Sequence, residues 1–229
     1  ITLTTPNINS EPPFVTFGFY HQKNAVYNQL TSLENGELPS SLLQLFLETA
    51  QGIDNIELST YSAYPETASL AWNTYLIDPD GNSSNMYVPT FITTDTVGFS
   101  YRVEQRGNMS DNQFCVGFTL SEKLSLGATI TSSSIDFDQT YVHAETPTDP
   151  DTELADWEYV GDLSIIGDGL NLKLGAIAHI DWLKLGITWR SPTVYNLRDR
   201  YSNSIYSNWK NGDQLHGTTS LYEYEYLLK

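Results

Sequence analysis

Apolar and polar residues alternate with a period of two along several stretches of the chain, which predicts β-strands with one apolar face. The clearest stretch is 183–190, where leucine, isoleucine and tryptophan alternate with lysine, glycine, threonine and arginine. Side chains of a strand point to opposite faces in turn, so each class falls on its own face. Similar alternation runs through 113–120, 124–131 and 222–228. The pattern is typical of an antiparallel sheet with one apolar and one polar face.

The predicted strands come in closely spaced pairs. These pairs are 112–120 with 124–133, and 170–179 with 183–190. About three residues join the strands of each pair, as in β-hairpins. The connections at the other end, 136–169 and 192–217, are predicted to be long loops. Short turns at one end and long loops at the other are typical of outer-membrane β-barrels.

Composition supports this interpretation. Charged residues make up only 17% of the chain, which contains 15 tyrosines and 5 tryptophans, as in barrels with aromatic girdles. No run of about 18 apolar residues predicts a membrane-spanning helix, but strands of about 9–11 residues can span a bilayer. The net charge of -17 argues against nucleic acid as a partner. The acidic stretch 145–162 is predicted to be a solvated loop.

One segment, 38–52, has the character of a short helix. It follows a proline, offers serine as a cap and ends in glycine. One interpretation is a loop helix packed on the rest of the protein. The other is that its surplus apolar side forms an external groove where a hydrophobic ligand first binds. The candidate ligand-binding residues of this helix are Leu42, Leu43, Leu45 and Phe46.

Three basic residues, Lys173, Lys184 and Arg190, fall in the middle of predicted strands among apolar neighbours. Such charges are costly in a dry core but not on the wall of a water-filled lumen. They are candidates for binding a carboxylate head group inside the lumen. The alternative is that they pair with Glu223 and Glu225, which are expected on a similar polar face.

Four motifs in the chain resemble a known family. They are Trp-Asn-Thr-Tyr-Leu-Ile-Asp-Pro at 72–79, Leu-Ser-Leu-Gly-Ala-Thr-Ile at 124–130, Gly-Asp-Gly-Leu-Asn-Leu-Lys-Leu-Gly at 167–175, and the stretch from Asp-Trp-Leu-Lys-Leu-Gly to Leu-Arg-Asp-Arg-Tyr at 181–201. In this order they resemble the long-chain fatty-acid transporter family of bacterial outer membranes. The resemblance covers roughly residues 70–229.

The resemblance implies an all-β fold: an antiparallel transmembrane β-barrel of the 14-stranded type, with a short helix in an outer loop. Residues 1–229 are then expected to form part of a single barrel domain. The chain has about half the usual length of the family, and neither the family's hatch nor its closing strands are recognised. The implied location is the bacterial outer membrane, with membrane lipid, a hydrophobic small molecule and other outer-membrane proteins as partners.

The function implied by the resemblance is passive transport of small hydrophobic compounds such as fatty acids. One alternative is a non-transporting barrel subunit of a surface-protein or secretion assembly, with the acidic loops as its docking surface. A second alternative is a soluble ligand-binding β-sandwich. The four histidines share no metal-binding spacing, and no hydrolase motif occurs. Catalysis, a metal site and a cofactor are therefore not expected.

Overall fold

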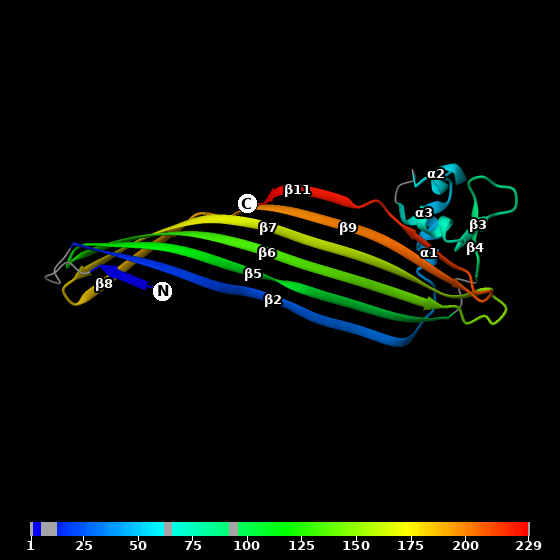
Figure 1. Cartoon of the computed structure of the whole chain (residues 1–229), viewed down its shortest axis with the longest axis horizontal. Coiled ribbons are helices and arrows are strands. Elements are labelled where there is room, and N and C mark those ends of the chain that lie inside the picture. The colour runs from blue at the N-terminus through cyan, green and yellow to red at the C-terminus, as the bar shows by residue number, and fades with distance from the viewer. Residues whose placement is uncertain (1, 6–12, 62–65, 92–95, 229) are drawn as a thin grey trace.

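A computed structural model describes residues 2–5, 13–61, 66–91 and 96–228, and most of them belong to one antiparallel sheet (Figure 1). Four strands run almost the whole length of the molecule: β2 (Phe14–Leu38), β5 (Val97–Ser121), β6 (Leu124–Thr146) and β7 (Leu154–Ile180). The shorter strands of this sheet are β1 (Thr2–Thr5), β8 (Leu183–Arg190), β9 (Val194–Trp209), β10 (Gln214–Thr218) and β11 (Tyr222–Leu228).

The sheet is an up-and-down meander, in which strands that follow one another in the chain lie side by side. The order is β1-β2-β5-β6-β7-β9-β10, with β8 on β7 and β11 on β9. Strands β8 and β9 both pair with β7 and together form one interrupted strand. The interruption contains Pro192, which has no N–H to donate to the sheet. A register shift of one residue accompanies it, from Lys173 opposite Arg190 to Leu170 opposite Val194.

The connection between β2 and β5 is a small insert. It contains α1 (Leu43–Ala50), α2 (Asn55–Ser59), α3 (Glu66–Asn73) and a second sheet of β3 (Ile77–Pro79) and β4 (Tyr87–Pro89). The insert lies at one end of the long sheet (Figure 1). None of the helices in the described ranges is long and apolar enough to cross a membrane.

The hydrophobic core lies where the insert packs on the sheet. Phe46 of α1 contacts Trp157 and Tyr159 of β7, with ring centroids 6.1 and 5.4 Å apart. We call the face that carries the insert the insert face, and the other the open face. The end with the insert is the insert end, and the end with the turns at 121–124 and 180–183 is the turn end. Burial of apolar area at the insert end stabilises the docking of the insert.

The antiparallel all-β class and the short helix are confirmed, because β-strands dominate and α1 lies within the predicted segment. Among the described residues the sheet does not close on itself: β2 and the β10–β11 side are not paired with each other. The second sheet comprises only β3 and β4 and lies in the insert. These residues therefore do not form the two large packed sheets of a β-sandwich.

The prediction of long loops at 136–169 and 192–217 is wrong. β6 continues to Thr146, β7 begins at Leu154, and β9 and β10 occupy most of the second range. The acidic stretch is largely strand, and within it Glu145 and Trp157 are fully buried. Side chains still alternate between the two faces in these strands. The two alternating classes, however, are aromatic and charged residues here, in place of apolar and small polar ones.

Candidate functional site

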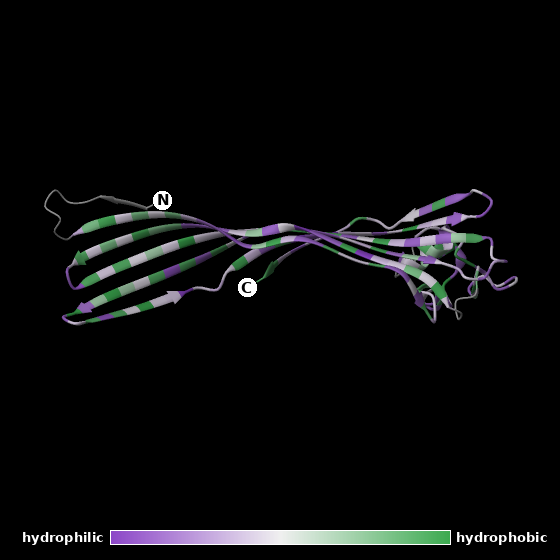
Figure 2. Cartoon of the chain, turned by 90° about the horizontal axis from the view of Figure 1, so that it is seen from below, coloured by the Kyte–Doolittle hydropathy of each residue, from purple (hydrophilic) through white to green (hydrophobic). Residues whose placement is uncertain are grey.

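The open face at the turn end carries a continuous apolar surface across five adjacent strands. The register places Phe19 beside Phe114, and Phe114 beside Ile130. These side chains are solvent-exposed, with Phe114 at 59% and Ile187 at 73%. In Figure 2 the strands are banded in green over this end. The apolar surface consists of Val15, Phe17, Phe19, Phe114, Val116, Phe118, Leu124, Leu126, Ala128, Ile130, Leu172, Leu174, Ala176, Ala178, Leu183, Leu185, Ile187 and Trp189.

The same face becomes charged toward the insert end. Arg106 lies beside Asp138, and Arg200 lies beside Glu223, whose carboxylate is 2.7 Å from the Arg200 Nε. Arg198 forms a second pair with Glu225. Purple bands become more frequent on the strands toward this end in Figure 2. The open face therefore becomes charged beyond the apolar surface on β5, β6 and β9, whereas β2 still exposes Val26 and Leu30 there.

The insert face has the reverse order. Toward the turn end its residues are mostly small or polar, together with the basic Lys173, Lys184 and Arg190. A hollow of about 500 Å³ lies over Gly117, Gly127, Gly175 and Thr188. Toward the insert end the same face becomes aromatic, with Tyr101, Tyr141, Tyr159, Tyr201 and Tyr222 among its residues. The apolar side chains thus change from one face to the other about halfway along the sheet.

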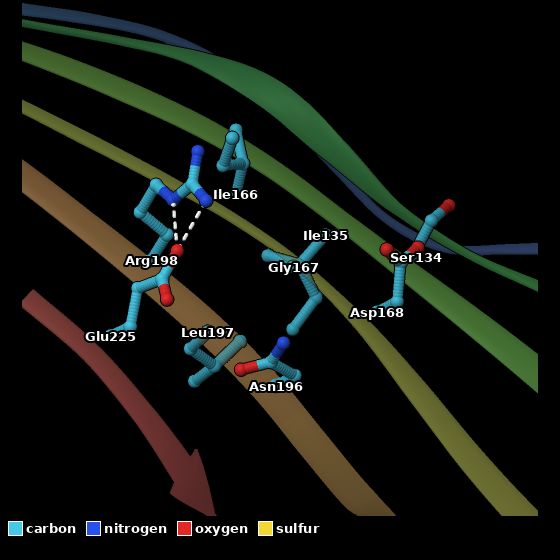
Figure 3. A pocket seen from close by; sticks show the side chains of 9 residues that line it. All are labelled: Ser134, Ile135, Ile166, Gly167, Asp168, Asn196, Leu197, Arg198 and Glu225. Carbon is cyan, nitrogen blue, oxygen red and sulfur yellow. Dashed lines mark hydrogen bonds and ion pairs between the residues drawn. The ribbon is translucent and has the colours of Figure 1, made fainter.

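A further hollow of about 330 Å³ lies on the open face where the apolar surface meets the charged one (Figure 3). Arg198 of β9 and Glu225 of β11 point toward each other at its edge, and Arg198 Nε donates to Glu225 Oε1 at 2.7 Å. This hydrogen bond and the two nearby carboxylates raise the pKa of Arg198. The other lining residues are Ser134, Ile135, Ile166, Gly167, Asp168, Asn196 and Leu197.

The residues predicted to form an apolar groove do not all lie on one surface. Leu43 and Phe46 are buried in the core, and Leu42 packs against it. Leu45 points outward and is 54% exposed. The side of α1 with Leu43 and Phe46 holds the insert on the sheet, while Leu45 remains available to a ligand.

The predicted basic residues lie on the insert face at the turn end. Lys173 is directly opposite Arg190, and Lys184 is opposite His179. The alternative prediction, pairing with Glu223 and Glu225, is wrong, because these carboxylates lie on the open face and pair with Arg198 and Arg200. The register shift at Pro192 changes the alternation between β8 and the strands that follow it, so sequence alternation alone could not relate the two groups.

A buried polar cluster under α1 was missed by sequence reasoning. Glu145 of β6 is fully buried, and its Oε1 lies 2.8 Å from Nε2 of His143. The Ser41 hydroxyl donates to Oε2 of the same carboxylate, and the Leu42 N–H donates to Oε1 at 2.7 Å. Buried carboxylates need such partners. Glu145 stood in the sequence within a run of acidic residues, so nothing marked it as buried.

In the ranges that the structure describes, no three His, Cys, Asp or Glu side chains are grouped to hold a metal ion. Burial raises the pKa of Tyr61 in the insert, with Glu66 contributing, and the phenol stays neutral.

No protein-family model, no curated protein and no solved structure matches the chain.

Proposed function

We propose that the chain forms part of the wall of an outer-membrane β-barrel that admits small hydrophobic compounds by passive diffusion. The resemblance of its four motifs to the fatty-acid transporter family points to the same function. The single observation that carries the proposal is the apolar surface on the open face of the turn end. Its large exposed side chains span five adjacent strands.

Lipid is the solvent that suits this surface best. In water, exposed apolar patches of monomeric proteins rarely exceed a few hundred Å², and this one is built from 18 aligned side chains on five strands, from Val15 to Trp189. Lipid-facing strands alternate apolar residues outward with polar or small residues inward. The insert face behind this surface carries mostly small, polar or basic side chains, in keeping with that arrangement.

The extent of the apolar surface also supports a membrane boundary. Strands of 23 to 27 residues are roughly 75–90 Å long, far more than the hydrocarbon thickness of about 30 Å. The continuous apolar surface covers only the turn end, and on β5, β6 and β9 the open face beyond it is charged. In the proposed arrangement the charged part of the sheet extends outside the bilayer together with the insert.

A hollow on the apolar surface, near the level where the charged open face begins, offers a binding site for an acyl chain. It measures about 530 Å³ and lies beside the interruption between β8 and β9. Its walls are mostly aliphatic, from Ile130, Leu170, Leu172, Pro192 and Val194. These aliphatic walls match a chain of methylene groups.

Membrane fractionation tests the proposal at its first step. The protein is expected in the outer-membrane fraction, and it is expected to migrate faster on a detergent gel before heating than after. Uptake of a hydrophobic dye by vesicles containing the protein then tests transport. A protein recovered in the soluble fraction without a heat-dependent shift would contradict the membrane assignment. A barrel that inserts but does not speed dye uptake would contradict transport alone.

A further inference from the structure

We infer that the insert face at the insert end binds a saccharide, through a row of glutamines flanked by aromatic rings. This inference goes beyond the proposed function, because it concerns the face of the sheet opposite the lipid-facing surface. It depends on side chains that the strand register brings together on the insert face. It does not depend on whether the open face contacts lipid.

The glutamine row crosses three neighbouring strands. The register aligns Gln29 of β2 with Gln105 of β5, and Gln105 with Gln139 of β6. Gln105 Nε2 donates to Gln139 Oε1 at 2.8 Å, and Gln29 Nε2 donates to Thr31 Oγ1 at 3.3 Å. Each amide group has two N–H donors and a carbonyl acceptor. These two bonds use only part of that capacity, so the row can donate to and accept from a ligand.

Aromatic rings continue the row and border it on both sides. Beyond Leu163, the row reaches Tyr201 and Tyr222, whose rings stack at 4.9 Å. On the side nearer the insert lie Tyr101 and Tyr141, in edge contact at 5.2 Å.

On the side nearer the turn end, Tyr27 and Phe137 meet at 4.9 Å. Gly107 lies opposite both residues in the strand register. The amides therefore lie between two groups of rings.

The charges of this region exclude an anionic ligand. From the row of Tyr27 to the insert, none of the strand residues that the register places on this face is Lys or Arg. The carboxylates among them are Glu145, which is buried, and Asp199. The sequence of the neighbouring insert, 39–96, contains no Lys or Arg either. Among the described residues of this surface, no Lys or Arg side chain offers the cation that a carboxylate head group would require.

A wholly apolar ligand is also disfavoured. It would cover the glutamine amides without hydrogen-bonding them, and each amide group left unpaired costs about 1–3 kcal/mol. A saccharide satisfies both parts of the surface. The C–H face of a sugar ring packs on an aromatic face, and its hydroxyls exchange hydrogen bonds with amides at the edge.

Calorimetric titration of the purified chain with maltohexaose and cellohexaose tests the inference, in a detergent without a sugar head group. We expect saturable binding of at least one of the two. The double variant Gln105→Ala/Gln139→Ala should weaken it at least tenfold, and Tyr141→Ala should do the same. Gln214→Ala and Tyr206→Ala are matched controls on the open face, and they should change the affinity less than about twofold.

Circular dichroism of each variant shows whether it is folded, and Gln105→Asn replaces the double variant if that variant is not. Absence of binding of both saccharides at about 10 mM would overturn the inference. Equal weakening by the open-face controls would also overturn it. So would palmitate or naphthalene binding that depends on the same glutamines, which would identify the surface as a path for apolar compounds.

Discussion

The backbone N–H of Leu42 and the side-chain carboxylate of Glu145 lie 2.7 Å apart, in a hydrogen bond between residues 103 positions apart in the chain. No side chain at the N-cap position of α1 caps the helix, so the sheet supplies an acceptor at its first turn. The N-terminus of a helix carries unpaired N–H groups and a positive partial charge, and both favour a carboxylate there. Glu145 thereby couples the position of the insert to β6.

Replacing this carboxylate should loosen the insert. Glu145→Ala leaves the Leu42 N–H and the Ser41 hydroxyl without their acceptor, and we expect a loss of about 1–3 kcal/mol in the free energy of unfolding. Limited proteolysis should also cleave the insert faster. Glu122→Ala, at an exposed turn, is the control and should behave like the wild type. Equal protease resistance of all three proteins would show that Glu145 does not hold the insert.

Two glycines in the sheet should respond differently to an added methyl group. A Cβ at Gly107 would collide with the backbone carbonyl of Asp136, and its φ of +131° is one that L-residues rarely adopt. Gly107→Ala is therefore expected to cost more than about 1 kcal/mol. At Gly127 the nearest atom, the carbonyl oxygen of Val116, would be 3.7 Å from the new Cβ. Gly127→Ala should leave stability unchanged or raise it, as measured by denaturant unfolding of both variants in micelles.

Substitutions on the two sides of α1 should change stability by different amounts, as measured by the same denaturant unfolding. Phe46→Ala removes a buried ring that contacts Trp157 and should cost about 3–5 kcal/mol. Leu45→Ala changes an exposed side chain and should alter stability by less than about 0.5 kcal/mol. If Leu45 contributes to first capture of a hydrophobic ligand, this variant should slow dye uptake by vesicles while remaining fully folded. Similar destabilisation by both changes would contradict the orientation of the helix.

The opposed cations Lys173 and Arg190 should repel each other. Like charges directly across a strand pair are destabilising, so Lys173→Gln should raise the free energy of unfolding by about 0.2–1 kcal/mol at low ionic strength. The gain should shrink at about 1 M salt, where the Debye length is about 3 Å. Lys184→Gln, opposite His179, is the control and should show a smaller salt dependence. A loss of stability on replacing Lys173 would mean that an anionic group bridges the pair.

The sequence predicted the turn-end half of the sheet well, because apolar and polar residues alternate cleanly there. The hairpins at 121–124 and 180–183 and the helix α1 all appear where the pattern indicates them. These features depend on local signals: a period of two, a short turn, and a proline and a glycine near the ends of a helix.

The insert-end half escaped prediction for a physical reason. Its strands place tyrosines on the insert face and charged residues on the open face. Residue hydropathy therefore no longer indicates which face of the sheet is buried. Glu145 and Trp157 stand in a stretch that composition assigns to a solvated loop, yet both are fully buried by the insert. Burial of this kind comes from a contact between distant segments, which no local pattern contains. The one-residue shift at Pro192 likewise separates Lys173 and Arg190 from Glu223 and Glu225.

Fluorescence quenching by lipid shows directly which face of the turn end contacts the bilayer. In a Cys115→Ser background, a bimane fluorophore is attached at Ile187→Cys on the apolar surface, at Thr188→Cys on the other face, and at Asp138→Cys on the charged part of the open face. Quenching by brominated lipid is measured against ordinary lipid after reconstitution into vesicles. We expect strong quenching at position 187 and little at 188 or 138. Equal quenching at 187 and 188, or none at 187, would contradict a lipid-facing surface.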